Sequence, residues 1–249
     1  MKKAQVIDIK TRRYDAASQT SRTSGWYTPS TDANSAITYP QLIRNRARDL
    51  ARNNHWANKG LTVIVNNTIG YGIRATWTAK NARATKQARA LWKQWAETTQ
   101  CDSQGLTNFY GIQQAVMRGV AESGECLIRL RPRYVSDGLA VPFQLQVLEP
   151  DYLYEYNDGV LANGNYIQRG IEYNPLGKRV AYYLYTSHPG AVGRFLGAVS
   201  TVYSRVPENE VIHCFRSTDR PGMERGVTWL APVMIRARDL DIYEDAYLS

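Results

Sequence analysis

The segment 220–232 constrains the chain more than any other stretch. Pro221 and Gly222 predict a tight turn, Gly226 adds a second glycine four residues on, and Pro232 stands just before a helix-like run. The segment therefore predicts a turn, a glycine hinge and the beginning of a helix in close succession. It contains no obvious catalytic group. We expect a chain whose most distinctive stretch specifies backbone geometry to act through assembly rather than through bond breaking.

Composition places the chain among globular, positively charged proteins. It has 249 residues, 43% of them hydrophobic, and a formal net charge of +9. No apolar run approaches the roughly 18 residues that span a bilayer, so no membrane partner is expected. Three widely spaced cysteines, Cys101, Cys126 and Cys214, predict buried reduced thiols rather than a disulfide frame. The basic excess favours anionic partners such as nucleic acid or acidic protein surfaces; the alternative is solvation of ordinary helix faces.

A basic stripe accompanies the first predicted helix, which begins at Thr38 with Pro40 in its first turn. Three arginines recur four residues apart, on a different face from the apolar residues: Arg44, Arg48 and Arg52. Such a stripe is usual for a solvated helix face. The more specific alternative is that these arginines contact DNA or an acidic neighbour. Residues 1–37 are rich in small polar residues and predict an arm without a core of its own.

Hydrophobic periodicity along the rest of the chain predicts an α+β fold. Helices are expected over 83–98, from Thr107 to Gly124, and from about Thr228 onward. The expected strands are 61–65, 126–131, 143–147, 166–173, 178–186, 202–206 and 210–215. Residues 174–177 predict a hairpin loop, and 187–200 a glycine-rich loop. The last helix reaches Ser249 without a capping residue, so the chain looks cut within an element.

Motifs of catalysis and cofactor binding are not found in the sequence. Gly70 and Gly72 resemble a fragment of a phosphate-binding loop, but an extended segment follows instead of a helix. The three histidines are isolated, so a metal site would need a coincidence of the fold. An acidic patch on the final helix could hold magnesium as in nucleases, or pair locally with Arg236 and Arg238; its members are Asp239, Asp241, Glu244 and Asp245. We expect no enzyme, no cofactor and no metal.

Nine short segments carry a resemblance to a known family. They lie at 13–17, 46–54, 67–73, 146–153, 170–173, 188–190, 211–213, 220–232 and 239–246, and include the run Gln146-Val147-Leu148-Glu149-Pro150-Asp151. In this order and spacing they resemble the portal proteins of lambda-like tailed bacteriophages and related prophages. Each segment alone is weakly specific, but together they cover nearly the whole chain. Family members continue well beyond the point at which this chain stops.

The resemblance implies a portal fold and a structural role in the virion. It implies a ring subunit, typically of a dodecamer, at one capsid vertex, assembled in the cytoplasm of the bacterial host. The implied partners are further copies of the chain, the large terminase subunit, the head-tail connector protein and the major capsid and scaffold proteins. Double-stranded DNA would pass through the ring during packaging and ejection without sequence-specific contacts.

The resemblance also suggests a division of the chain. We expect an extended arm over 1–37, a mixed helix and strand wing-like body over 38–150, and a β-rich, clip-like section over 151–215. Residues 216–249 would form a turn and the start of a stem-like helix, with Gly222, Gly226 and Pro232 as the hinge into it. Two alternatives stay open at this stage: a general DNA-binding module, favoured by the net charge, and a metal-dependent nuclease that uses Asp241 and Asp245.

Overall fold

The computed structural model describes residues 20–21, 23–26, 28, 30–35, 39–77, 81–191 and 202–248. Most of the predicted arm, the predicted helix cap Thr38, the greater part of the predicted loop 187–200 and the chain end Ser249 lie outside these residues. The predicted α+β class is confirmed. The described helices are α1 (Pro40–Asn53), α2 (His55–Thr68), α3 (Ala82–Ala96), α4 (Phe109–Ser123) and α5 (Met234–Leu248).

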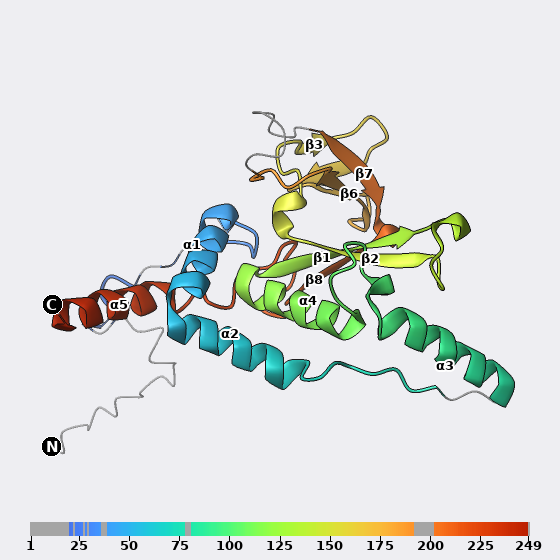
Figure 1. The fold of residues 1–249 in the computed structure, drawn as a ribbon. Coiled ribbons are helices and arrows are strands. Elements are labelled where there is room, and N and C mark those ends of the chain that lie inside the picture. Colours follow the sequence, from blue (N-terminus) through green and yellow to red (C-terminus); the bar gives the residue numbers. More distant parts are fainter. Residues whose placement is uncertain are drawn as a thin grey trace, which may run out of the picture.

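The strands form two antiparallel sheets (Figure 1). The first sheet has the order β2-β1-β8 and is built from β1 (Glu125–Pro132), β2 (Phe143–Leu148) and β8 (Val211–Phe215). The second has the order β3-β4-β5-β6-β7 and is built from β3 (Gly159–Val160), β4 (Tyr166–Gln168), β5 (Ile171–Tyr173), β6 (Arg179–Tyr185) and β7 (Tyr203–Pro207). The final strand of the predicted β-rich section thus returns to β1. In this antiparallel ladder the backbone of Cys214 lies opposite that of Cys126, and both thiols are free.

One apolar core joins the two sheets, and a second joins the helices. Leu127 of β1 and Val211 of β8 pack with Ile171, Leu184 and Val206 of the second sheet. The helical core contains Ala47, Ala51, Leu61, Ala121 and Leu230. Because alanines of α1 and α4 supply much of this core, the helix backbones can approach one another closely. Figure 1 shows α4 lying along the β2-β1-β8 sheet with α2 beneath it.

The predicted strand 61–65 is wrong, because these residues form the middle of α2. Leu61 and Val65 are buried one helical turn apart, and Ile64 packs beside them. The Asn54 side chain begins the helix by accepting a hydrogen bond from the Ala57 amide at 2.7 Å. A short apolar run rich in β-branched residues does not distinguish a strand from a buried helix segment by its periodicity.

The predicted strand 166–173 is divided into β4 and β5 by a two-residue turn. Arg169 has φ +50° and Gly170 has φ +80°, the combination that a tight hairpin of the mirror-image type requires. Gly170 also lies so close to Tyr154 that an added Cβ would stand 2.8 Å from the Tyr154 carbonyl oxygen. The next loop is confirmed, since the Gly177 amide donates to the Asn174 carbonyl at 2.8 Å.

The segment after β8 holds part of the N-terminal region. Asn34 donates from its side chain to the Gly222 carbonyl at 3.0 Å and accepts from the Glu224 amide at 3.0 Å. Arg220 donates to the carbonyls of Thr31 and Asp32. These described residues of the predicted arm therefore lie against the segment 220–224 of their own chain.

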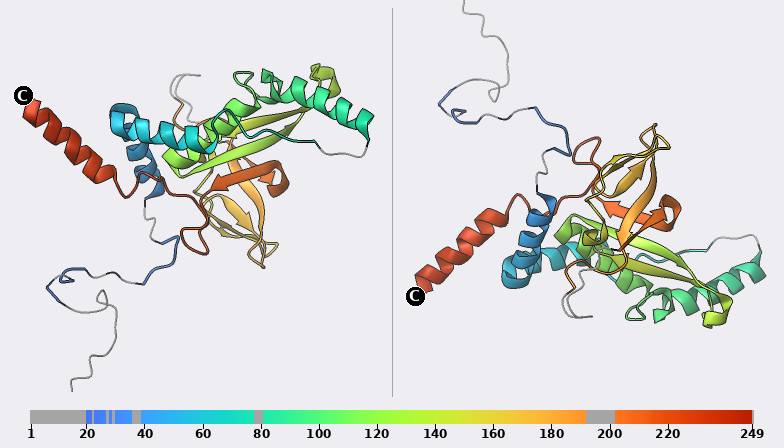
Figure 2. Two further views of the ribbon diagram at one scale, coloured as in Figure 1. Left: turned by 90° about the horizontal axis from the view of Figure 1, so that it is seen from below. Right: turned by 90° about the horizontal axis from the view of Figure 1, so that it is seen from above.

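The last helix begins at Met234, six residues later than predicted. Residues 228–233 form successive turns instead, in which the Ala231 amide donates to the Thr228 carbonyl and the Val233 amide to that of Leu230. Pro232 lies within these turns and has no N–H to donate, so it interrupts a regular helical ladder there. The turns place Leu230 in the helical core, and α5 then projects from the body beside α1 (Figure 2).

Candidate functional site

The most elaborate polar arrangement in the described part of the chain surrounds Glu125, the first residue of β1. Its side chain is only 1% exposed. Arg225 donates to it from Nε at 2.9 Å and from Nη2 at 2.5 Å, and the Gly226 amide donates to Oε2 at 3.0 Å. His213 of β8 lies against the same oxygen at 2.9 Å. A buried carboxylate is tolerated only when such donors replace the lost water.

Arg225 connects this carboxylate to the second sheet. The Arg225 side chain is 2% exposed. Its Nη1 donates to Glu155 Oε1 at 2.6 Å and to the carbonyl oxygen of Arg169, in the turn between β4 and β5, at 3.1 Å. One guanidinium therefore binds the start of β1 and the turn of the other sheet at the same time. Because guanidinium is planar and presents five donors, arginine suits this position in a way that lysine would not.

The protonation states in this network follow from its contacts. Burial would raise the pKa of the Glu125 carboxyl, but the Arg225 charge and the His213 hydrogen bond hold that pKa well below its usual range. Burial lowers the pKa of His213. Arg179 lies 3.0 Å from His213 Nδ1 and can only donate, so Nδ1 accepts and Nε2 carries the proton that it donates to Glu125. His213 is therefore neutral, with a fixed tautomer.

Two of the three predicted arginines of α1 join the network. Arg44 is 3% exposed, with Nη2 3.7 Å from Glu125 and Nη1 3.2 Å from Asp151. Arg48 donates to Asp151 at 2.6 Å and lies 3.1 Å from Glu149. The prediction of a solvated face is thus wrong for Arg44, because the carboxylates of Glu125 and Asp151 draw its side chain into the protein. Arg52 is exposed. Of the three, Arg52 alone keeps the full exposure that an external contact needs.

The predicted hinge residues have different surroundings. Gly222 has φ +82°, which favours glycine in its turn, and nothing lies within 4 Å of an added Cβ. Gly226 is needed for close approach instead, since a Cβ there would stand 2.1 Å from the carbonyl oxygen of Gly124. Pro232 is exposed in the turns before α5. Gly226 therefore lets the segment 220–232 reach the start of β1, and whether the three residues act as a hinge stays a prediction.

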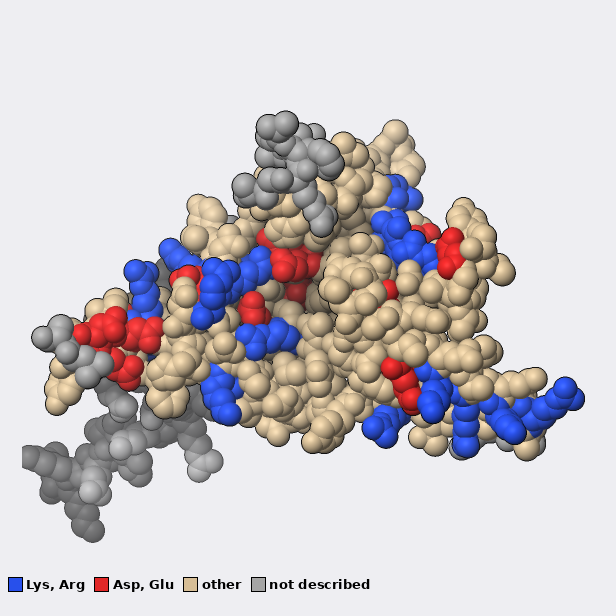
Figure 3. All heavy atoms as spheres, in the orientation of Figure 1, with Lys and Arg blue, Asp and Glu red and all other residues tan. Residues whose placement is uncertain are grey.

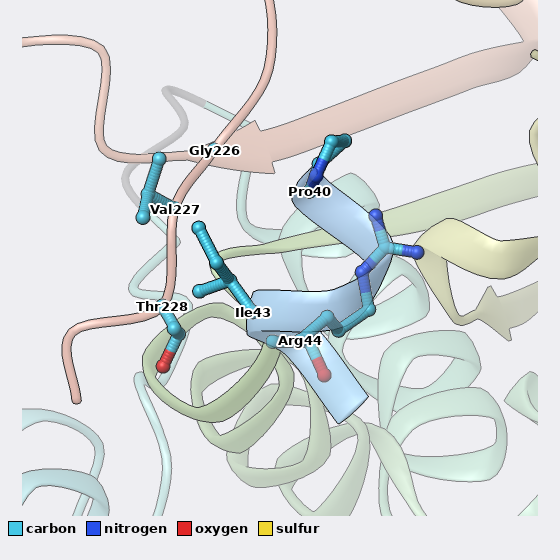
Figure 4. A pocket seen from close by; sticks show the side chains of 7 residues that line it. Pro40, Ile43, Arg44, Gly226, Val227 and Thr228 are labelled. Carbon is cyan, nitrogen blue, oxygen red and sulfur yellow. The ribbon is translucent and has the colours of Figure 1, made fainter. Parts of the chain in front are cut away.

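The contact of this segment with α1 is tight. Figure 4 shows Ile43 of α1 facing Val227 and Thr228, with Arg44 extending away on the same helix. The cavity between them measures only about 10 Å³, which holds at most one water molecule. Thr228 is buried and donates to the Ala121 carbonyl of α4 at 3.4 Å. The segment is thus wedged between two helices and the sheet.

Acidic residues meet a histidine at one further place. Glu149, Asp151 and His188 each offer a ligand atom within 4.8 Å of the others. The fold therefore places one of the three isolated histidines beside two carboxylates. Arg48 already forms an ion pair with each of the two carboxylates there. The acidic patch of α5 does not form such a group among the described residues; its Asp241 accepts a hydrogen bond from Asn54 at 2.6 Å. Asp241 is thus already engaged by the side-chain amide of Asn54, and the nuclease alternative is left to a test of activity.

Sequence reasoning missed the two central residues of the network. Arg225 lies inside the segment 220–232, which was interpreted through its glycines and prolines alone. Glu125 directly precedes the apolar run of β1, and a charged residue at the start of a buried strand is a signal that an opposite charge must be found. The sequence does not identify that partner, because Arg225 is 100 residues away.

The network therefore connects the two sheets and the first helix inside the protein. The sequence matches the model of the family described as phage portal protein, lambda family, over residues 19–249. The chain belongs to this family of phage portal proteins, which is structural rather than enzymatic. The chain is 29% identical over 231 residues to the probable portal protein of Halomonas phage phiHAP-1, a match that covers 88% of this chain and 43% of that relative.

The chain thus spans less than half the length of this relative. None of the helices in the described ranges is both long and apolar enough to cross a membrane.

Proposed function

We propose that this chain belongs to a portal subunit, copies of which form a ring at one vertex of a phage capsid. Double-stranded DNA passes through the ring during packaging and ejection. The observation that carries the proposal is the family match over residues 19–249, which includes every described helix and strand. The virion is then the site of function, and assembly in the host cytoplasm is part of the same proposal.

The exposed C-terminal helix supports a role in self-assembly. On α5, Ile235 is 77% exposed and Tyr247 is 80% exposed, and Ile242 and Tyr243 are also largely open to solvent. Large apolar side chains exposed on a helix are expected to be buried against other chain segments. Neighbouring subunits in a ring would supply that cover. The braced body fits this role, because a ring subunit must present its contact surfaces in fixed positions.

The finer assignments are also proposals. We assign 38–150 to a wing-like body, the β3–β7 sheet within 151–215 to a clip-like section that meets the large terminase subunit, and 216–249 to the beginning of the stem. The connector, capsid and scaffold proteins complete the set of partners. DNA or subunit contact by the basic helix is proposed for Arg52 only, because Arg44 and Arg48 are held by internal carboxylates.

Electron microscopy of the purified full-length protein tests the proposal. Closed rings are expected, and a field of single particles of monomer size would contradict it. Ile242→Asp on α5 should lower the fraction of rings without lowering the melting temperature. Leu176→Asp places the same charge at an exposed leucine in the 174–177 loop and should leave ring formation intact. Equal ring fractions in both variants would remove α5 from the subunit contact.

We also propose that the protein has no nuclease activity of its own. Supercoiled plasmid incubated with the protein and magnesium or manganese should stay intact. Nicking that disappears in Asp241→Asn would favour the nuclease alternative instead, because Asp241 belongs to the acidic patch of α5.

A further inference from the structure

Two of the three cysteines lie opposite each other in the first sheet. The backbone of Cys126 in β1 faces that of Cys214 in β8 across the antiparallel ladder. Opposing residues of such a ladder direct their side chains to the same face of the sheet, so both thiols lie on one side of it. On that side a Cβ added to Gly119 of α4 would stand 3.4 Å from Cys126 Sγ. The fold therefore brings together two free thiols that no local motif pairs.

The ladder sets the distance between these two residues. Its register runs without a shift from Glu125 to Arg129. Opposing Cα atoms in an antiparallel ladder are about 4.5 or 5.5 Å apart, and both distances lie within the range of about 4.4–6.8 Å that a disulfide bridges. Opposing Cβ atoms are about 4.5–5.5 Å apart, whereas a relaxed disulfide needs about 3.5–4.5 Å. A bond between the two sulfurs is thus within reach but strained, and strained disulfides are the more easily reduced ones.

The third cysteine does not compete for this contact. Cys101 ends the short helix η2 (Thr99–Cys101), and Asp102 directly after it bridges Leu145 of β2. Because β2 and β8 are opposite edges of the sheet, Cys101 lies beyond the edge that is remote from Cys214. Cys101 is buried like Cys126, so it provides an internal control for oxidation that depends on pairing rather than on burial.

The two opposing thiols differ in their access to solvent. Cys126 is 3% exposed, and Cys214 is partly exposed. Burial, helped by nearby thiol and carboxylate charges, raises the pKa of Cys126 to about 12, and burial raises the pKa of Cys214 as well. Because the thiolate is the attacking species, oxidation at neutral pH is expected to be slow. It is expected to begin at Cys214, which a small oxidant reaches first.

We propose that Cys126 and Cys214 are a site of reversible oxidation, at which a disulfide joins β1 to β8. The oxidant is a small disulfide of the glutathione class. The Cys214 thiolate attacks one of its sulfurs, and one small thiol leaves. The Cys126 thiolate then attacks the Cys214 sulfur of this mixed disulfide, and the second small thiol leaves. The two protein thiols lose two electrons and two protons, which the small disulfide gains as it becomes two thiols.

The cross-link would act beside the network around Glu125. Cys126 follows Glu125 in β1 and Cys214 follows His213 in β8, so the bond would join the two strands next to the Glu125–His213 contact. It would also tie the start of the segment that follows β8 to β1. Disulfides are rare in a reducing cytosol and persist at virion surfaces, so the thiols would be free during assembly and joined in the released particle. This timing rests on the virion location proposed above, whereas the chemistry of the pair does not.

Peptide mapping of the oxidised full-length protein tests this proposal. The folded protein is kept at about pH 8.5 with oxidised glutathione, its remaining thiols are alkylated, and it is digested without reductant. We expect a linked peptide pair that contains Cys126 and Cys214, joined within one chain and separated again by dithiothreitol. Cys101→Ser should give the same linked pair in the same yield. Cys214→Ser should abolish it and leave Cys126 free of glutathione, because Cys126 is buried.

Three outcomes would overturn the proposal. A glutathione adduct on Cys214 with Cys126 still free would make Cys214 a simple surface thiol. Links that form only between chains, seen on a non-reducing gel, would place the thiols in a subunit contact instead. Thiols that stay unreacted in the folded protein and oxidise only in urea would show that the native fold keeps them apart. The mapping is made on the unaltered sequence, so it does not depend on the folding of a variant. Ring formation is recorded separately by mass photometry, which distinguishes these results from a failure of the proposed portal role.

Discussion

At the scale of single residues, the Glu125–Arg225 pair decides how the body is held together. Both side chains are almost completely removed from water and both are multiply bonded. Because a buried ion pair costs desolvation energy, it adds less stability than its short distances suggest. Removing one partner is a different matter, because the other charge is then left buried and unpaired. The pair therefore fixes the positions of β1, the segment 220–232 and the second sheet relative to one another.

Glu125→Gln should reduce the free energy of unfolding by about 3–5 kcal/mol, because Arg225 then loses its main counter-charge in a buried site. Urea denaturation of the variant and the wild type measures this. Asp219→Asn breaks the half-exposed Arg216–Asp219 pair and should change stability by no more than about 1 kcal/mol. An equal loss of unfolding free energy in the two variants would show that the buried pair contributes no more to stability than the surface pair.

Gly226→Ala should destabilise the protein by at least about 2 kcal/mol, because the new Cβ would collide with the backbone of Gly124. Gly60→Ala is the matched control. Gly60 lies in α2 with nothing within 4 Å of an added Cβ, so alanine there should raise stability by up to about 1 kcal/mol. Thermal melts of the two variants should move in opposite directions; a tolerated Gly226→Ala would contradict the close approach.

Acid should destabilise the protein in two stages. The pKa of His213 is lowered in the folded state, so the unfolded state binds more protons once the pH falls below about 6.5. The lowered pKa of Glu125 adds a second loss as the pH falls below its ordinary value. Each group contributes at most about 1.4 kcal/mol per pH unit. Urea unfolding of His213→Gln between pH 7.5 and 4 should lack the first stage, and an unchanged profile would refute this assignment.

At the scale of elements, the sequence predicted a helix or strand correctly where residues within that element set its ends. The amphipathic helix α3 and the end of α4 at Gly124, where φ is +93°, needed only local spacing and a left-handed glycine. Strands β1 and β2 were equally visible from alternation. The class of fold therefore follows from local chemistry. Its errors were also local: α2 has a strand-like composition, and the Arg169–Gly170 turn lacks the usual Asn-Gly signal.

The candidate site was much less predictable, because its residues come from distant parts of the chain. Arg44 and Arg48 were singled out for their spacing, but spacing alone does not distinguish a solvated face from one drawn to Asp151 and Glu125. The return of β8 to β1 brings His213 to the same carboxylate. Such pairing between distant strands is a property of the folded topology, and no local pattern encodes it.

Asn54 offers a test of how α5 is attached to the body. Its Oδ1 caps α2, and its Nδ2 donates to Asp241 of α5 at 2.6 Å. Asn54→Ala removes both contacts and should cost about 1–2 kcal/mol. Asn54→Asp keeps the cap but faces Asp241 with a like charge, so it should release α5 selectively. Hydrogen exchange of α5 amides should rise in both variants; unchanged protection would show that this tether does not hold the helix.

At the scale of the whole molecule, acidic and basic side chains gather at opposite ends. Acidic side chains gather over α5, and basic ones gather over α3 (Figure 3). The braced body between them keeps these surfaces at a fixed separation. In our account the α5 end meets neighbouring subunits. The net charge of +9 does not by itself indicate DNA binding, because two arginines that seemed available to DNA pair with internal carboxylates.

The central claim is that this chain belongs to a ring-forming portal subunit. Mass photometry of the purified full-length protein tests it most directly, because it counts the subunits in each particle. We predict a dominant population at one high multiple of the subunit mass, with few intermediate species, as expected for a closed ring. A strictly monomeric population under assembly conditions would contradict the account.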